Sequence, residues 1–456
     1  MSESRVFSGQ LSAKVHFCLT HLIIPWIPAA HLHLFDGQGF PYRYSLPSAP
    51  YRVPSFGGHV RRGPRVRQKS ISEERQVTVL HVVQPVEGGV ARVVTDLVRA
   101  QALAGLRPVV ACPPESPLAA GAEAAGADVL AWPAVRDPGP GLAAEVATAH
   151  RLVRQSGPQI VHAHSAKAGL AARLAVRGRI PTVFQPHAWS FEAVEGRTAH
   201  LALKWERFGA RWSDHILCVS ESERRTGERA GISARWSVIH NGIDLGHFRP
   251  AGPAERAAAR AALPLPGAVD ARTPLVVCVG RLSRQKGQDV LLRAWEQLRV
   301  SGARLVLVGD GPDERRLRET APAGVVFAGA TQDVRPWIHA ADVFVLPSRW
   351  EGMALAPLEA MACGRPVVMS DVNGARESLP PGHDVHCLVP PENPAALAAA
   401  LTSLLTDPVL RDELGRTART HTRSVFDVRK TAGAVHRIYQ ELVGLSRPTT
   451  RERTDR

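Results

Sequence analysis

The chain has 456 residues and a formal net charge of +14, with 56 lysines and arginines against 42 acidic residues. This length allows two or three domains, and the charge favours nucleic acid, an anionic membrane face or an anionic substrate as partner. Because no aromatic-interleaved RNA motif or helix-turn-helix pattern is present, we expect no nucleic acid partner. The six cysteines are scattered without a C-x-x-C pair, which indicates a reducing, cytoplasmic setting.

Residues 1–76 differ from the rest of the chain and are predicted to be a disordered, basic extension. Their apolar run, residues 16–35, is interrupted by Pro25 and Pro28, so it predicts neither a membrane span nor a secretory signal. Residues 41–69 are rich in proline, tyrosine, glycine and arginine, a composition that offers no core of its own.

From Val77 to about residue 249, short apolar runs alternate with amphipathic segments. Such alternation predicts a parallel sheet covered by helices on both faces. Helices are expected at residues 90–100, 142–155 and 167–177. The predicted strands are residues 77–83, 108–112, 127–132, 159–164, 181–185 and 215–220.

Two connections in this half could face a ligand. Gly88 and Gly89 lie between a strand and a helix start, a geometry that can cradle a phosphate, although most such glycines serve only the turn. His187 follows the strand 181–185, and an imidazole at the carboxyl end of a parallel strand is well placed for a cleft. A lone histidine is more often structural.

The segment Glu195–Trp212 is predicted to be a basic amphipathic helix. Its cations and its large apolar residues form two neighbouring stripes. Either the helix lies on an anionic membrane, or the apolar stripe packs into the core and the cations face water. The two stripes are Arg197, His200, Lys204, Arg207 and Arg211, and Leu201, Trp205, Phe208 and Trp212.

The second half repeats the alternation after an Ala- and Pro-rich linker at residues 250–273. A strand ends at Gly280, and the turn that follows carries Arg281 and Lys286 before a helix at residues 288–300. Two cations in such a turn can neutralise a diphosphate, although a solvated basic turn would look the same.

A Gly-Asp-Gly turn, Gly309 to Gly311, follows the next strand. It suggests a dinucleotide-binding turn, but that motif needs a third glycine where Glu314 stands, so the motif is incomplete.

The stretch Pro347–Pro366, PSRWEGMALAPLEAMACGRP, carries two carboxylates after a buried strand. Pro357 suits the first turn of a helix, so Glu351 is predicted in a loop and Glu359 in that first turn. Gly352 allows close backbone approach, and the helix start offers free N–H groups. This stretch resembles the Glu-x7-Glu signature of the retaining glycosyltransferases of family 4.

The resemblance implies the GT-B fold, in which two Rossmann-like domains face each other across a cleft. It covers Val77 to about Leu445, and GRL-x-x-x-KG at Gly280 matches the diphosphate-binding element of the family. The implied organisation is an extension at 1–76, an acceptor-side domain at 77–249, a linker at 250–273, a donor-binding domain at 274–427, a helix at 428–445 crossing back to the first domain, and a polar tail at 446–456.

The resemblance also implies roles for particular residues. Arg281 and Lys286 would stabilise the departing diphosphate, Glu359 would bind ribose, and Glu351 and His187 would contact the sugar. The family has His-Gly where this chain has His187 and Ala188. The remaining implied donor-binding residues are Gly88, Gly89, Gly280, Gly309, Gly311, Gly352, Met353, Ala354 and Leu355.

The implied function is sugar transfer from a nucleotide-diphosphate donor, linked to UDP or GDP, to a hydroxyl acceptor in cell-surface polysaccharide or glycolipid synthesis. We expect no metal and no further cofactor, and a location in the cytoplasm or at the inner face of the membrane. Two alternatives stay open: a nucleotide-sugar epimerase or phosphorylase on the same fold, and an assembly protein that has lost catalysis. The presence of Arg281, Lys286, Glu351 and Glu359 argues against the second alternative.

Overall fold

The structure is a computed structural model that describes residues 76–136, 139–263, 270 and 272–445. The predicted basic extension, except Gln76, and the polar tail lie outside the described residues. None of the helices in the described part of the chain is long and apolar enough to cross a membrane.

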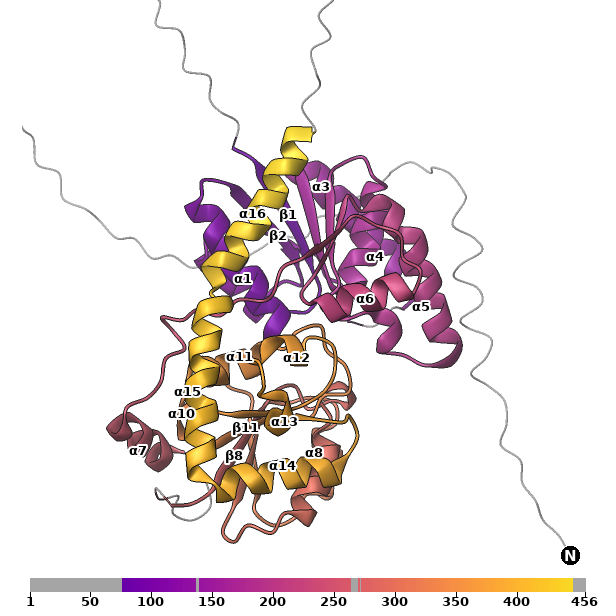
Figure 1. Ribbon diagram of the computed structural model, residues 1–456. Coiled ribbons are helices and arrows are strands. Elements are labelled where there is room, and N and C mark those ends of the chain that lie inside the picture. Colours follow the sequence, from indigo (N-terminus) through magenta and orange to yellow (C-terminus); the bar gives the residue numbers. More distant parts are fainter. Residues whose placement is uncertain (1–75, 137–138, 264–269, 271, 446–456) are drawn as a thin grey trace, which may run out of the picture. The chain divides into compact units, whose positions relative to one another are not determined.

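The N-terminal lobe is a parallel seven-stranded sheet in the order β3-β2-β1-β4-β5-β6-β7 (Figure 1). Its central strands are buried along almost their whole length, as expected for strands covered on both faces. The strands are β1 (Thr78–Val83), β2 (Arg107–Cys112), β3 (Asp128–Ala131), β4 (Ile160–His164), β5 (Thr182–Gln185), β6 (His215–Cys218) and β7 (Trp236–Val238). The helices are α1 (Gly88–Leu103), α2 (Pro117–Ala124), α3 (Leu142–Ser156), α4 (Ser165–Val176), α5 (Gly196–Gly209) and α6 (Glu221–Arg229).

The C-terminal lobe is a second parallel sheet, with six strands in the order β10-β9-β8-β11-β12-β13. The strands are β8 (Leu275–Val279), β9 (Arg304–Val308), β10 (Val325–Gly329), β11 (Val343–Leu346), β12 (Val367–Ser370) and β13 (Leu388–Val389). Its helices are α8 (Gln288–Gln297), α9 (Glu314–Glu319), α10 (Arg335–Ala340), α11 (Leu355–Ala362), α12 (Ala375–Ser378), α13 (Asp384–Cys387), α14 (Pro394–Thr406) and α15 (Pro408–Val425). Two parallel α/β sheets confirm the expected pair of Rossmann-like units.

The chain returns to the N-terminal lobe through α16 (Val428–Leu445), which packs against α1 and β4 (Figure 1). The connection between α15 and α16 is bonded to the N-terminal lobe, since Ile243 N–H donates to Phe426 O at 2.7 Å. Tyr439 of α16 is only 1% exposed and lies against the sheet, so this helix is part of the N-terminal core.

Some elements were not anticipated. The predicted linker contains α7 (Pro253–Ala262), and α2, α6 and α15 fall in segments for which no helix was predicted. In α6 the reason is compositional, because its nine residues, ESERRTGER, contain no large apolar side chain to form a periodic stripe.

Candidate functional site

The two lobes meet at Gly352, in the loop after β11. A Cβ atom at this position would lie 2.8 Å from His187 O and 2.8 Å from Val219 Cγ2, both of the N-terminal lobe. Ser220 Oγ donates to Gly352 O at 2.9 Å. Only glycine therefore fits between the carboxyl ends of the two sheets, where parallel α/β folds bind ligands.

Lys286 and Glu351 form an ion pair beside this contact. Lys286 Nζ lies 2.5 Å from Glu351 Oε1, and Ser348 Oγ donates to the same oxygen at 2.7 Å. Glu351 is 7% exposed, so its charge is held by these two partners rather than by water. The sequence predicted that Lys286 binds the diphosphate of the donor and that Glu351 contacts its sugar. In the structure, the two side chains are in direct contact with each other.

Glu359 lies in the second turn of α11, not in the first turn as predicted. The helix begins at Leu355, two residues before Pro357. Pro357 is tolerated as the third residue, because the N–H groups of the first turn have no partner within the helix and the missing N–H of proline costs no hydrogen bond. The carboxylate is 5% exposed and pairs with Arg92 Nη1 of α1 at 3.0 Å. Burial raises the pKa of Glu359, and Arg92 partly offsets that rise.

The first N–H groups of α11 have no side-chain cap, because the N-cap is Ala354. The adjoining carbonyl, Met353 O, accepts a hydrogen bond from Asn241 Nδ2 of the N-terminal lobe at 2.8 Å. Gly89, at the start of α1, faces the same place, since a Cβ there would lie 3.7 Å from Leu355 Cδ1. Gly88 has a φ of 72°, and a Cβ there would meet nothing within 4 Å. The structure therefore brings the Gly-Gly turn next to the helix start of the opposite lobe.

The other predicted glycines serve close packing between two turns. A Cβ at Gly309 would lie 2.3 Å from Gly280 O, and one at Gly311 would lie 2.3 Å from Leu282 O. These contacts place the Gly-Asp-Gly turn directly beside the turn that carries Arg281. Arg281 is exposed, and no ion pair joins it to another described residue.

His187 lies at the end of β5 with a φ of 61°, followed by Ala188 at 152°. Both values are in the region that favours glycine, so the loop is strained. The Nε2 atom of His187 lies 3.1 Å from Nδ1 of the fully buried His164. Burial lowers the pKa of His187 to about 3. The imidazole is therefore neutral at physiological pH.

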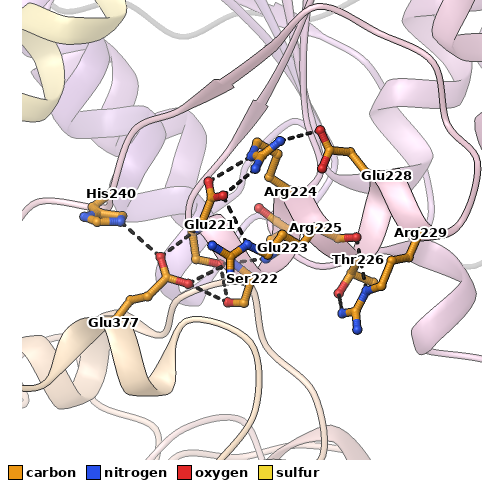
Figure 2. Close-up of polar contacts among 11 residues, drawn as sticks. Glu221, Ser222, Glu223, Arg224, Arg225, Thr226, Glu228, Arg229, His240 and Glu377 are labelled. Carbon is orange, nitrogen blue, oxygen red and sulfur yellow. Dashed lines mark hydrogen bonds and ion pairs between the residues drawn. The ribbon is translucent and has the colours of Figure 1, made fainter.

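Two further carboxylates at the lobe contact were not predicted. Glu377 of α12 accepts hydrogen bonds from Glu221 N at 2.7 Å, Ser222 N at 2.8 Å and Ser222 Oγ at 2.7 Å, at the start of α6 (Figure 2). Burial alone would raise the pKa of Glu377, but these bonds and one from His240 lower it to about 2.

Glu223 of α6 is the second of these carboxylates. It is fully buried, with Val219 N–H donating to its Oε2 at 2.8 Å, and burial raises its pKa to about 8. The spacing Ser220-x-x-Glu223 is that of a capping box, a signal that could have located this helix start in the sequence.

The comparisons agree with this geometry. The family description "Glycosyltransferase Family 4" matches residues 87–247, and "Glycosyl transferases group 1" matches residues 273–407. TuaC of Bacillus subtilis, named for teichuronic acid biosynthesis, is 32% identical over 295 residues, which are 63% of this chain and 72% of TuaC.

A D-inositol 3-phosphate glycosyltransferase of Streptomyces bingchenggensis is 34% identical over 62% of this chain and 66% of its own length. Among solved structures, Anabaena Alr3699/HepE in complex with UDP and glucose has a TM-score of 0.70 at 22% identity. That match covers 80% of this chain and 100% of HepE. This last likeness shows the shared two-lobed fold.

Proposed function

Because this chain belongs to the family 4 glycosyltransferases, we propose that it transfers a sugar from a nucleotide-diphosphate donor to a hydroxyl acceptor with retention of anomeric configuration. The name of TuaC, together with that of a lipopolysaccharide core mannosyltransferase of Rhizobium leguminosarum, supports an acceptor in cell-surface polysaccharide or glycolipid synthesis. The UDP bound by HepE supports a uridine donor, with GDP donors as the other class to test.

The observation that carries the proposal is the convergence of Lys286, Glu351 and the His187 loop around Gly352. A cation at the end of one sheet can take the diphosphate, while a carboxylate 2.5 Å away can accept bonds from sugar hydroxyls. The exposed Arg281 lies in the same turn as Lys286 and can add a second, forked contact to phosphate oxygens.

The same groups can stabilise the nucleoside diphosphate as it leaves the sugar. Negative charge develops on the diphosphate as the sugar leaves, and preorganised cations stabilise that charge most where water is excluded. Lys286 is a partly buried cation beside Glu351, and it becomes available to the diphosphate when the sugar hydroxyls bond to that carboxylate. Glu359, in turn, would accept bonds from ribose hydroxyls once Arg92 has moved aside.

The test is a panel of UDP- and GDP-sugars, measured by thermal shift and by release of the nucleoside diphosphate. Lys286→Ala should lower kcat/KM by two to three decades, or about 2.7–4 kcal/mol, the scale of one electrostatic stabiliser. Arg284→Ala, in the same turn but paired with the exposed Glu195, is the matched control and should change little. Full activity of Lys286→Ala, or sugar isomerisation without transfer to an acceptor, would overturn the proposal.

We also propose that α5 attaches the N-terminal lobe to an anionic membrane face. Its apolar stripe is divided between the two interpretations, because Leu201 and Phe208 are each 43% exposed, whereas Trp205 and Trp212 are half-buried. Only Glu206 and Gly209 of α5 are buried, and Glu206 forms a buried ion pair with Arg173 of α4 at 2.7 Å. The helix thus leaves Leu201 and Phe208 at the surface, while Trp205 packs under Arg173 and Trp212 lies beside Gly178.

Vesicle binding tests this second proposal. The triple variant Arg197→Gln, Lys204→Gln, Arg211→Gln should lose about 1 kcal/mol of binding to acidic vesicles per cation. The same three changes should have little effect on neutral vesicles. Unchanged binding to acidic vesicles would show that the exposed stripe is not a membrane contact.

A further inference from the structure

A row of buried hydrogen-bonding side chains runs inward from His187. His187 Nε2 lies 3.1 Å from His164 Nδ1, and His164 Nε2 lies 3.0 Å from His81 Nδ1. His81 Nε2 then lies 2.9 Å from Gln101 Oε1, on α1. His81 and His164 have no exposed surface, so every ring nitrogen in the row depends on its neighbour.

The row continues from Gln101 to the helix that returns from the C-terminal lobe. Gln101 Nε2 lies 3.5 Å from the hydroxyl of Tyr439, and that hydroxyl lies 2.6 Å from His162 Nδ1. Beyond it, His162 Nε2 and Gln185 Oε1 are both buried, and no hydrogen bond from another described residue reaches either atom. Burial lowers the pKa of His162, and the nearby Gln185 offsets only a small part of that change.

All four imidazoles are neutral. Burial lowers the pKa of His81 to about 4 and that of His187 to about 3, and it lowers those of His162 and His164 well below the ordinary value. A neutral imidazole has one N–H donor and one acceptor nitrogen. The direction of a single bond in the row therefore fixes the direction of all the others.

Gln101 sets that direction. Gln101 Oε1 can only accept, so His81 donates through Nε2–H and accepts through Nδ1. His164 must then donate through Nε2–H and accept through Nδ1, and His187 must donate through Nε2–H. At the other end, Tyr439 accepts from Gln101 Nε2 and donates to Nδ1 of His162, which leaves the proton of that ring on Nε2. Every bond points the same way, and Nδ1 of His187 remains an acceptor.

The same cluster has the ligand spacing of a metal site, because one nitrogen from each of His81, His162 and His164 lies within 4.8 Å of the others. The charge balance favours the hydrogen-bonded row. No carboxylate of the described residues acts on these three rings, so a buried dication would be uncompensated, which is costly.

We propose that Gln101 and Tyr439 are positioning residues that hold His187 in one tautomer, with its proton on Nε2 and a hydrogen-bond acceptor at Nδ1. The consequence for the reaction rests on the proposed function: the donor sugar must present a hydroxyl that donates to this nitrogen. A sugar derivative methylated at that hydroxyl would lose the hydrogen bond to Nδ1. A cationic His187 could not accept this bond from any sugar, because both of its ring nitrogens would carry protons.

The experiment is nitrogen NMR of the full chain labelled with 15N-histidine, without any donor, so that it does not depend on the enzymatic activity. The His187 signals are assigned by their loss in His187→Asn. We expect a single tautomer with a protonated Nε2 in the wild type. Gln101→Leu should give signals of both tautomers, and Gln101→Glu, whose carboxylate accepts from the same His81 N–H, should restore the single form.

Val98→Ala, on the same helix and equally buried, controls for loss of stability and should leave the tautomer unchanged. With an active donor, Gln101→Leu should lower kcat/KM about two- to tenfold, the scale of one neutral hydrogen bond. A wild-type His187 protonated on Nδ1, a Gln101→Leu spectrum identical to wild type, or a stoichiometric metal by elemental analysis would each overturn the proposal.

Discussion

Glu377→Gln should weaken the contact between the two lobes more than any loss of a surface charge would. The native carboxylate accepts three bonds from the first residues of α6, where the helix dipole favours negative charge (Figure 2). Its pKa falls from the ordinary 4.5 to about 2, which would correspond to about 3 kcal/mol at full value. Because the group is only half buried, solvent screening reduces this figure, and we expect about 1.5–2 kcal/mol.

The assay is urea unfolding at several pH values. A depressed pKa stabilises the folded state above the unfolded pKa, so the difference between wild type and Glu377→Gln should be full above about pH 4.5 and shrink toward pH 2. Glu228→Gln, which changes an exposed carboxylate of α6, the helix that Glu377 caps, is the control and should cost less than about 0.5 kcal/mol. Equal unfolding midpoints for Glu377→Gln and wild type at pH 7 would refute the reasoning.

Two further predictions concern the same region. Glu223, with a pKa raised to about 8, should make the wild type lose stability as the pH rises from about 4.5 through 8, and Glu223→Gln should remove that slope; a wild-type stability that is flat with pH would contradict this. Ala188→Gly should stabilise the fold by about 1 kcal/mol in urea unfolding, because a glycine relieves the strain at a φ of 152°, whereas a loss of stability would show that the alanine methyl group packs usefully.

The sequence predicted the sheets well because their signal is local. Strands buried on both faces are continuous apolar runs, as in TVLHVV of β1, and they need no knowledge of distant residues. The final helix was predicted at residues 428–445 and has those bounds, because its apolar positions recur with helical spacing. The helix α6 was missed because it has no periodic apolar stripe, and because part of its capping comes from Glu377, 155 residues away from Ser222.

The candidate site was accessible from motif spacing, but its pairings were not. Nothing in the local sequence indicates that Arg92 meets Glu359 or that Gln101 meets His81, since each pair joins separate elements. The sequence likewise could not decide whether the apolar stripe of α5 meets a membrane or the core, because that depends on which face of α5 is covered by α4. Both cases show that spacing identifies the groups, while tertiary contacts decide their charge state and partner.

The Lys286–Glu351 pair leads to a last prediction, which concerns how the enzyme binds the free diphosphate compared with the intact donor. A free nucleoside diphosphate must draw Lys286 away from Glu351, which leaves a carboxylate at 7% exposure without its cation. An intact donor offsets that cost, because its sugar hydroxyls can donate to the carboxylate. Glu351→Gln has no such charge to strand, so it should bind the free diphosphate about 5- to 30-fold more tightly than wild type, or by about 1–2 kcal/mol, while its turnover falls.

Calorimetric titration of wild type and Glu351→Gln with the free diphosphate and with the intact donor measures this directly. Ser348→Ala is the matched variant, because it removes a neutral bond to the same oxygen but keeps the charge, and it should not tighten diphosphate binding. If Glu351→Gln weakened diphosphate binding instead, Glu351 would have to orient Lys286 for the phosphate rather than compete for it. The carboxylate would then belong to the diphosphate subsite and not to the sugar.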